Sequence, residues 1–155
     1  MRVTKRTNIA VRVLMYCAVH RDRLVTKSEI AGACNASEHH LGQIVNQLAQ
    51  LGYIETRRGR HGGLKLGREP GEIRLGALFR AFEAKSALAE CFLAKGNTCP
   101  LVGACRLQGV LHSAGEAFFD ALEEFSLSYL VDDNAALDKL FALVEQPLAS
   151  AKVLD

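Results

Sequence analysis

Two short segments of alternating apolar and polar residues flank an arginine- and glycine-rich stretch near the middle of this 155-residue chain. The segments are Tyr53–Thr56 and Leu64–Leu66, and the glycines between them predict the turn of a β-hairpin. Helical patterns precede the hairpin at about 8–20, 27–34 and 38–51. The order helix, helix, turn, helix, hairpin predicts a mainly α fold, a winged helix-turn-helix with a small β-hairpin wing.

Capping residues set the expected helix boundaries. Thr7 is expected to cap the first helix, and Ser37 the third. Thr26 and Glu29 have the spacing of a capping box at the start of the second helix. Gly52 is expected to end the third helix.

The second half of the chain predicts further helices at 73–83 and 105–125, a short turn at 126–131 and a last amphipathic segment at 134–146, with an irregular segment at 84–104. We therefore expect a DNA-binding domain over 1–83 and a cofactor-binding loop over 84–104. A dimerisation helix with C-terminal helices should follow over 105–146, and then a flexible tail over 147–155.

Charge is distributed unevenly. Residues 1–70 carry 12 Lys and Arg against 5 Asp and Glu, a net charge of +7, whereas residues 71–155 carry 7 against 12, a net charge of −5. A basic N-terminal half favours a polyanion such as double-stranded DNA as partner. No apolar run is long enough to cross a bilayer and no signal peptide is recognised, so a cytoplasmic protein without membrane contact is expected.

The predicted third helix and the hairpin supply the candidate DNA contacts. In a helix-turn-helix, the N-terminal part of the second helix of the motif faces base edges, and an arginine-rich wing tip reaches phosphates or the minor groove. The candidates are Ser37, His39, His40, Gln43, Asn46, Arg57, Arg58, Arg60 and His61. The alternative is a winged-helix fold used for protein contacts, with these charges merely solvated.

Three of the five cysteines fall within fifteen residues, in the pattern C-x7-C-x5-C formed by Cys91, Cys99 and Cys105. Structural zinc sites use closer pairs, so these wider spacings favour an iron–sulfur cluster. A zinc site, a thiol–disulfide sensor and three unliganded cysteines remain as alternatives. Cys17 and Cys34 are expected to be buried filler residues, and the sequence carries no common catalytic motif, so an enzyme is not expected.

The long helix at 105–125 has one sustained apolar face, longer than a small winged domain can cover. Two copies of this face are expected to pair in a homodimer and present two recognition helices to a palindromic operator. The alternative is that the segment 134–146 covers the face within one chain. The face comprises Leu107, Val110, Leu111, Ala114, Phe118, Ala121, Leu122 and Phe125.

The chain resembles the Rrf-type iron–sulfur transcription regulators over nearly its full length. The matching stretches are Met1–Thr4, Arg57–Leu64, Glu90–Phe92, Cys99–Leu101, Cys105–Leu107, Ala114–Phe119 and Ser126–Val131. The stretches Asn46–Leu48, Gly52–Tyr53 and Cys91–Leu107 are most similar to the nitric-oxide-sensitive repressors of the family, and second to its rhizobial iron regulators.

This resemblance implies a repressor that binds one cluster per subunit through its three loop cysteines, 4Fe–4S in preference to 2Fe–2S, with nitric oxide as the signal. Iron or cluster supply is the alternative signal, and a zinc or thiol redox sensor the alternative site. Some relatives place an aspartate ligand from the partner subunit near the start of the first helix, where this chain has Asn8. The fourth ligand is thus Asn8, an acid such as Glu83 or Glu90, water, or none.

Overall fold

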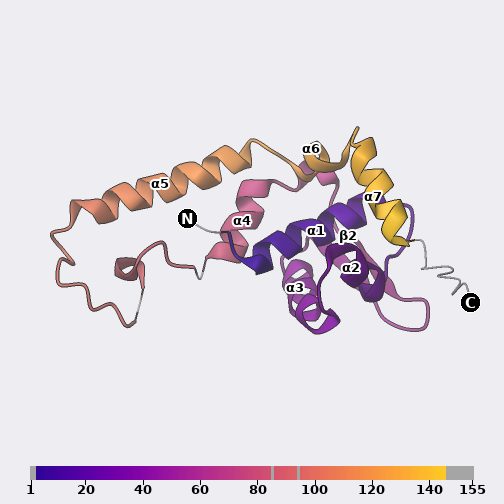
Figure 1. Ribbon diagram of the computed structural model, residues 1–155, viewed down its shortest axis with the longest axis horizontal. Coiled ribbons are helices and arrows are strands. Elements are labelled where there is room, and N and C mark those ends of the chain that lie inside the picture. Colours follow the sequence, from indigo (N-terminus) through magenta and orange to yellow (C-terminus); the bar gives the residue numbers. More distant parts are fainter. Residues whose placement is uncertain (1–2, 85, 94, 146–155) are drawn as a thin grey trace, which may run out of the picture.

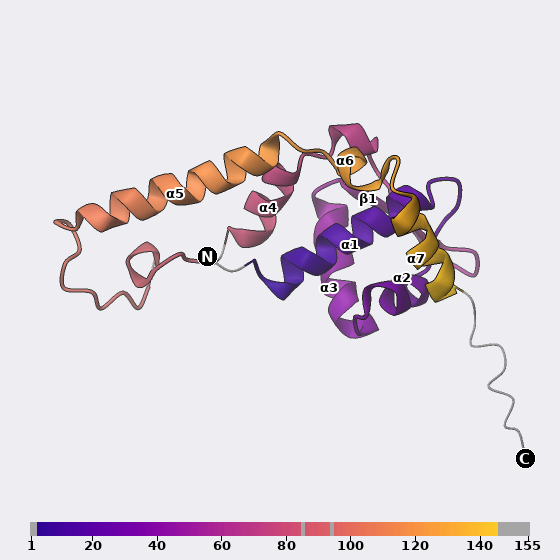
Figure 2. The same cartoon turned by 45° about the horizontal axis from the view of Figure 1, so that its top comes forward.

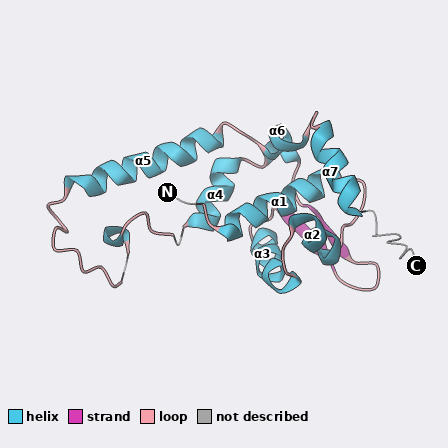
Figure 3. Ribbon diagram, in the orientation of Figure 1, coloured by secondary structure: helices cyan, strands magenta, loops and turns pink. Residues whose placement is uncertain are grey.

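The computed structural model describes residues 3–84, 86–93 and 95–145. Its N-terminal body contains α1 (Lys5–Val19), α2 (Lys27–Cys34), α3 (Glu38–Gln50) and the two-stranded antiparallel sheet of β1 (Ile54–Arg57) and β2 (Gly63–Leu66). Figure 1 shows α2 and α3 packed beneath α1, and Figure 3 shows the strands behind α2. This is the mainly helical winged fold that the sequence predicts.

Aliphatic side chains from α1, α2 and α3 form the core, which matches the low aromatic content. Ser37 caps α3, and the capping box of Thr26 and Glu29 is present. The prediction of Thr7 as the cap of α1 is wrong, because Thr4 occupies that position and accepts a hydrogen bond from the Thr7 amide. Thr7 instead lies one turn inside the helix and is fully buried.

The wing is attached to the body through a bridge between Val25 and Leu64, whose amides and carbonyls exchange hydrogen bonds of 2.9 and 2.8 Å. Its tip depends on glycine. A Cβ at position 62 would lie 2.2 Å from the Arg57 carbonyl oxygen, closer than any real contact, and Gly59 has a φ of +108°. The hairpin therefore holds its arginines on a tight turn that other residues would strain.

After the short helix η1 (Pro70–Glu72), α4 (Leu75–Glu83) crosses the end of α5 (Arg106–Glu123) at Gly76. A Cβ at position 76 would lie 2.5 Å from the Phe119 carbonyl oxygen, so only glycine lets the backbones approach this closely. The Glu123 carboxylate accepts a hydrogen bond of 2.7 Å from the Ala77 amide at the start of α4. These contacts attach the C-terminal end of α5 firmly to α4.

The rest of α5 leaves the body. Figures 1 and 2 show α5 and the segment that joins it to α4 extending away from α1–α3 as an arm, with the short helix η2 (Glu90–Phe92) on that segment. At the other end, α6 (Leu127–Val131) and α7 (Ala135–Glu145) return to the body, where Phe141 packs edge-on against Tyr16 of α1. The expected tail at 147–155 lies outside the described residues. Among the described helices, none is long and apolar enough to span a membrane.

Candidate nucleic-acid interface and metal centre

The buried face of α3 determines which of its side chains reach solvent. Leu41, Ile44, Val45 and Leu48 point into the core, and Glu38, His39, Gln43 and Asn46 are exposed on the opposite side. Ser37, which caps the helix, is also exposed. These short polar side chains line the surface that a helix-turn-helix offers to the major groove.

Two polar residues of α3 do not join this surface. His40 is half-buried, and its Nε2 is enclosed without a hydrogen-bond partner among the described residues, because the ring turns toward the protein interior. Gln47 is also half-buried, and its Nε2 donates a hydrogen bond of 3.3 Å to the carbonyl oxygen of Ala81 near the end of α4. Gln47 thus joins the recognition helix to α4, a role the sequence pattern does not indicate.

The wing presents Arg57, Arg58, Arg60 and His61 as exposed side chains. In the part of the chain that the structure describes, none of the three arginines forms an ion pair, whereas Lys65 on the same hairpin is paired with Glu55 at 3.0 Å. Between the wing, Asn46 of α3 and the start of α2 lies a groove of about 460 Å³. Unpaired arginines beside the exposed face of α3 give this surface the positive charge that DNA recognition requires.

The five cysteines fall into two groups. Cys17 and Cys34 are buried in the core, and burial raises the pKa of their thiols to about 12 and about 11. Such thiols stay protonated and are poor ligands and poor nucleophiles. The burial of Cys17 and Cys34 in the core agrees with their expected role as filler residues.

Cys91, Cys99 and Cys105 are free and half-buried in the segment between α4 and α5. Cys91 lies in η2, Cys99 donates its amide to the Asn97 side chain at 3.0 Å, and Cys105 is the residue before α5. Together with the residues between Ala84 and Arg106 they form what we call the cysteine loop.

Among the described residues, no group of three His, Cys, Asp or Glu side chains is close enough to hold a single metal ion. The donor set nevertheless suits a larger group. Three reduced, half-buried thiols on one loop are the ligand type that iron–sulfur clusters use. The residues therefore fit an iron–sulfur cluster by the chemistry of their donor atoms.

The candidate fourth ligands lie in different environments. Asn8 is exposed on the first turns of α1. The Glu83 carboxylate accepts hydrogen bonds from the Thr4 amide at 2.9 Å, from the Thr4 hydroxyl at 2.8 Å and from the Thr7 hydroxyl. Burial alone would raise the pKa of Glu83, but these bonds outweigh it and hold the pKa below its usual value. Glu83 thus joins α4 to the start of α1.

The Glu90 carboxylate forms bonds within the cysteine loop itself. It accepts hydrogen bonds from the Thr98 amide at 2.5 Å and from the Thr98 hydroxyl at 2.7 Å, and these lower its pKa. Its position beside Cys91 makes it a candidate ligand in the sequence, but its bond to the residue beside Cys99 is not evident there.

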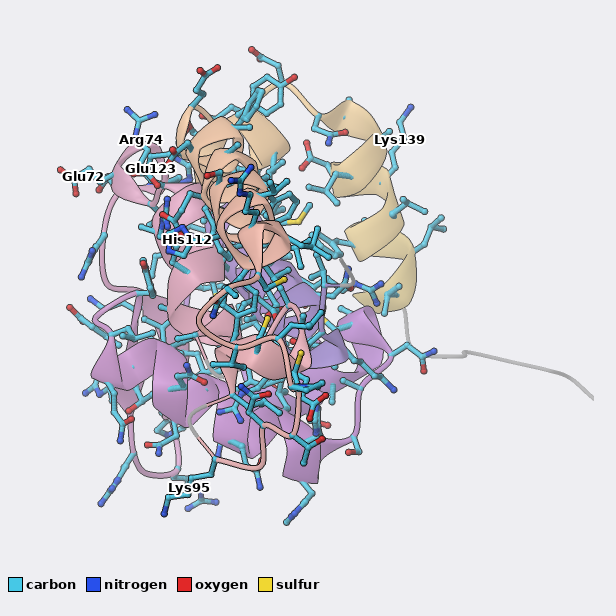
Figure 4. All side chains as sticks on the ribbon, turned by 90° about the vertical axis from the view of Figure 1, so that its left-hand side faces the viewer. Glu72, Arg74, Lys95, His112, Glu123 and Lys139 are labelled. Atoms are coloured by element: carbon cyan, nitrogen blue, oxygen red, sulfur yellow. The ribbon has the colours of Figure 1, made fainter. Side chains whose placement is uncertain are left out.

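The apolar face of α5 is only partly used within the chain. Leu111, Phe118 and Leu122 are half-buried, and Phe118 contacts Phe79 of α4 edge-on. The side chains of Leu107 and Val110 are 59% and 63% exposed, and Ala114, Ala121 and Phe125 are exposed as well. α7 does not cover them. It packs on α1 and α2, and Lys139 of α7 lies across the molecule from Arg74 and Glu123 (Figure 4).

The helix-turn-helix and its arginine-bearing wing define a winged-helix transcription regulator rather than an enzyme. The chain belongs to the Rrf2 family, whose model, described as an iron-dependent transcriptional regulator, matches residues 3–133.

Relatives that are similar in sequence support the assignment to this family. The HTH-type transcriptional regulator NsrR of Geobacillus kaustophilus (strain HTA426) is 45% identical over 141 residues, which are 90% of this chain and 96% of that relative. Protein aau3 of Rhizobium meliloti (strain 1021) is 42% identical over 153 residues, 97% and 99% of the two chains.

Solved structures show the same fold at lower identity. T. potens IscR has a TM-score of 0.66 and 21% identity, covering 84% of this chain and 85% of its own. Oxidised CymR of Staphylococcus aureus has a TM-score of 0.65 and 22% identity, covering 85% of this chain and 97% of its own.

Proposed function

We propose that the protein is a DNA-binding repressor that senses nitric oxide through an iron–sulfur cluster held by Cys91, Cys99 and Cys105. The observation that carries the proposal is the set of three free, half-buried thiols on a loop continuous with α4, the helix that contacts the recognition helix. The nitric oxide assignment rests on the resemblance to the nitric-oxide-sensitive repressors of the family, the branch called NsrR, and several relatives at 35–45% identity bear that name. We retain the division into a DNA-binding domain (1–83), a cluster loop (84–104) and a dimerisation region (105–146).

When bound, an iron–sulfur cluster would supply iron as the site for nitric oxide. The family resemblance implies 4Fe–4S in preference to 2Fe–2S, with one cluster per subunit. The protein's own part is to translate a change in the cysteine loop into a change at the DNA surface. α4 is suited to this role because it leads directly into the loop.

Three residues in the last turn of α4 connect it to other helices. Glu83, its last residue, holds Thr4 and Thr7 at the start of α1. Ala81 accepts the hydrogen bond of Gln47 from the recognition helix. Arg80 forms ion pairs of 2.6 Å with Glu116 and with Asp120 of α5. A shift of the loop that moves the end of α4 therefore reaches both the recognition helix and the candidate dimer helix.

Binding to a palindromic operator requires two copies. Pairing through the exposed residues of α5 would place two recognition helices on one side of the assembly, as two-fold operators need. The structure favours this pairing over coverage by α7, because α7 lies at the other end of the body.

We expect the wing to contact DNA. Replacing Arg57, Arg58 and Arg60 together with Ala takes away up to three side chains per subunit that can bind phosphates or the minor groove. The slope of log affinity against log salt should therefore fall by about 0.9 for each phosphate that is no longer bound. This slope is measured by fluorescence anisotropy with an operator duplex at several salt concentrations. The control is Lys139→Ala on α7, which removes a positive charge far from α3, and an unchanged slope in the triple variant would exclude the wing from the interface.

A second signal is favoured by one observation, the description of the matching family model as iron-dependent. In that case the level of iron or cluster supply, rather than nitric oxide, would control binding to the operator. A zinc-bound or thiol redox form of the same site is the third possibility.

One experiment separates these functions. The protein is purified without air and its visible spectrum and operator affinity are recorded before and after stoichiometric nitric oxide, and in parallel after an iron chelator. A brown protein whose spectrum changes and whose DNA affinity falls with nitric oxide fits the proposal. A brown protein that responds only to the chelator supports iron sensing, and a colourless protein that contains zinc or no metal contradicts the cluster.

A further inference from the structure

The three cysteine segments are tied to one another by side chains that are not cysteines. Glu90, beside Cys91, binds both the amide and the hydroxyl of Thr98, beside Cys99. Gln108, one turn into α5 from Cys105, donates its Nε2 to the carbonyl oxygen of Cys91 at 3.1 Å. Two side chains thus connect the first segment to the second and to the third without any bound group.

We propose that Glu90 and Gln108 are positioning residues that hold the three cysteine-bearing segments together before a cluster is bound, so that the chain accepts and retains a cluster. The proposal rests on the proposed function in taking these thiols as the ligands. The loop bonds themselves are a property of the chain alone and are tested separately below.

No side chain in the described part of the loop, residues 86–93 and 95–105, is fully buried. Leu93, Leu101 and Val102 are exposed, so the loop lacks a core of its own. Gly96 and Gly103 have φ values of +83° and +90°, in the region where glycine gives the backbone freedom. At the beginning of the loop, Leu88 lies over Gly115 of α5.

A carboxylate is well suited to joining the segment of Cys91 to the segment of Cys99. A single oxygen of Glu90 accepts two hydrogen bonds, and bonds to an ionised acceptor are roughly twice as strong as those between neutral groups. The bonds close the stretch from Glu90 to Thr98, which contains Lys95 on the side of the loop away from α5 (Figure 4). Gln108 then sets the distance between that closed stretch and the helix that follows Cys105.

The competing role for Glu90 is that of a cluster ligand. The two roles predict different behaviour in the protein without a cluster. A ligand has no effect there, whereas a positioning residue determines the conformation of the loop before any iron is bound.

The test begins with cluster-free full-length protein and measures amide hydrogen exchange by NMR. In Glu90→Ala, the Thr98 amide loses its acceptor and should exchange about tenfold faster or more than in the wild type. Glu90→Gln keeps an acceptor oxygen but no charge. Its Thr98 amide should exchange at a rate between those of the wild type and Glu90→Ala. Glu72→Ala, an exposed carboxylate on η1 outside the loop, is the matched control and should leave Thr98 unchanged. Equal Thr98 exchange in the wild type and Glu90→Ala would overturn the proposal.

The second measurement is cluster retention after anaerobic reconstitution, as iron and sulfide per chain and as the rate of iron loss to a chelator. Glu90→Ala and Gln108→Ala should each bind less cluster and lose iron several-fold faster than the wild type. If the wild type binds iron and sulfide and both variants retain them equally well, the positioning role is wrong. If the wild type binds neither, the proposed function fails, whatever the amide exchange shows about the loop.

Discussion

Replacing Val110 with Asp is expected to convert a dimer into a monomer while leaving the fold intact. Val110 is 63% exposed on the arm, so its own chain loses little packing in the variant. In a paired α5 seam, two carboxylates would be brought into an apolar contact, at a cost of several kcal/mol. Analytical ultracentrifugation should give the mass of one chain. Operator affinity should fall by about a hundredfold or more, because one half-site binds weakly alone.

Ser113→Asp is the matched control, since Ser113 is exposed on the same helix but outside the apolar face. It adds the same charge to α5 and should leave the dimer intact. Phe118 is less suitable for the test because it contacts Phe79 of α4 within the chain. A Val110→Asp variant that sediments as a dimer would place the interface elsewhere.

Loss of any one loop thiolate should nearly abolish cluster binding. Cys91→Ala, Cys99→Ala and Cys105→Ala each remove one charged bond to iron, and a cluster left with two thiolates is labile. Each variant should be almost colourless after anaerobic purification and should bind the operator more weakly. Iron and sulfide per chain, with visible absorbance, measure the loss. Full occupancy in one of the three variants would exclude that cysteine as a ligand.

Cys17→Ala and Cys34→Ala are the controls and should keep the cluster, since both thiols are buried and protonated. Asn8→Ala removes at most a weak neutral ligand, so this variant should keep most of its cluster. Asn8→Asp should slow the reaction with nitric oxide if position 8 reaches iron. Unchanged kinetics there would leave Glu83, Glu90 or solvent as the remaining candidates for the fourth ligand.

Local signals in the sequence predict the elements well. The Thr26 capping box, the Ser37 cap and the glycines of the wing each act within a few residues, and all are present in the structure. The first cap is harder to predict, because Thr4 and Thr7 are both suitable residues three positions apart. What decides between them is Glu83, far away in sequence, which binds both hydroxyls.

The candidate site is less predictable because its contacts also depend on residues that are far apart in the sequence. Exposed positions on α3 and on the wing follow from helical and strand periodicity, but the inward turn of His40 and the bond from Gln47 to Ala81 depend on where α4 packs. Spacing picks out the three cysteines. It gives no sign that Glu90 and Gln108 bind across the loop, since those contacts depend on its folded path.

The glycine at the crossing of α4 and α5 has a mechanical consequence. The stretch of α5 from the crossing at Phe119 back to Arg106 is roughly 20 Å long at a rise of about 1.5 Å per residue. A rotation of about 10° at the crossing would then move the far end by roughly 3.5 Å, about the separation of neighbouring base pairs. With α5 as a lever arm, a tilt too small to disturb the core is enough to put two recognition helices out of step with the turns of the duplex.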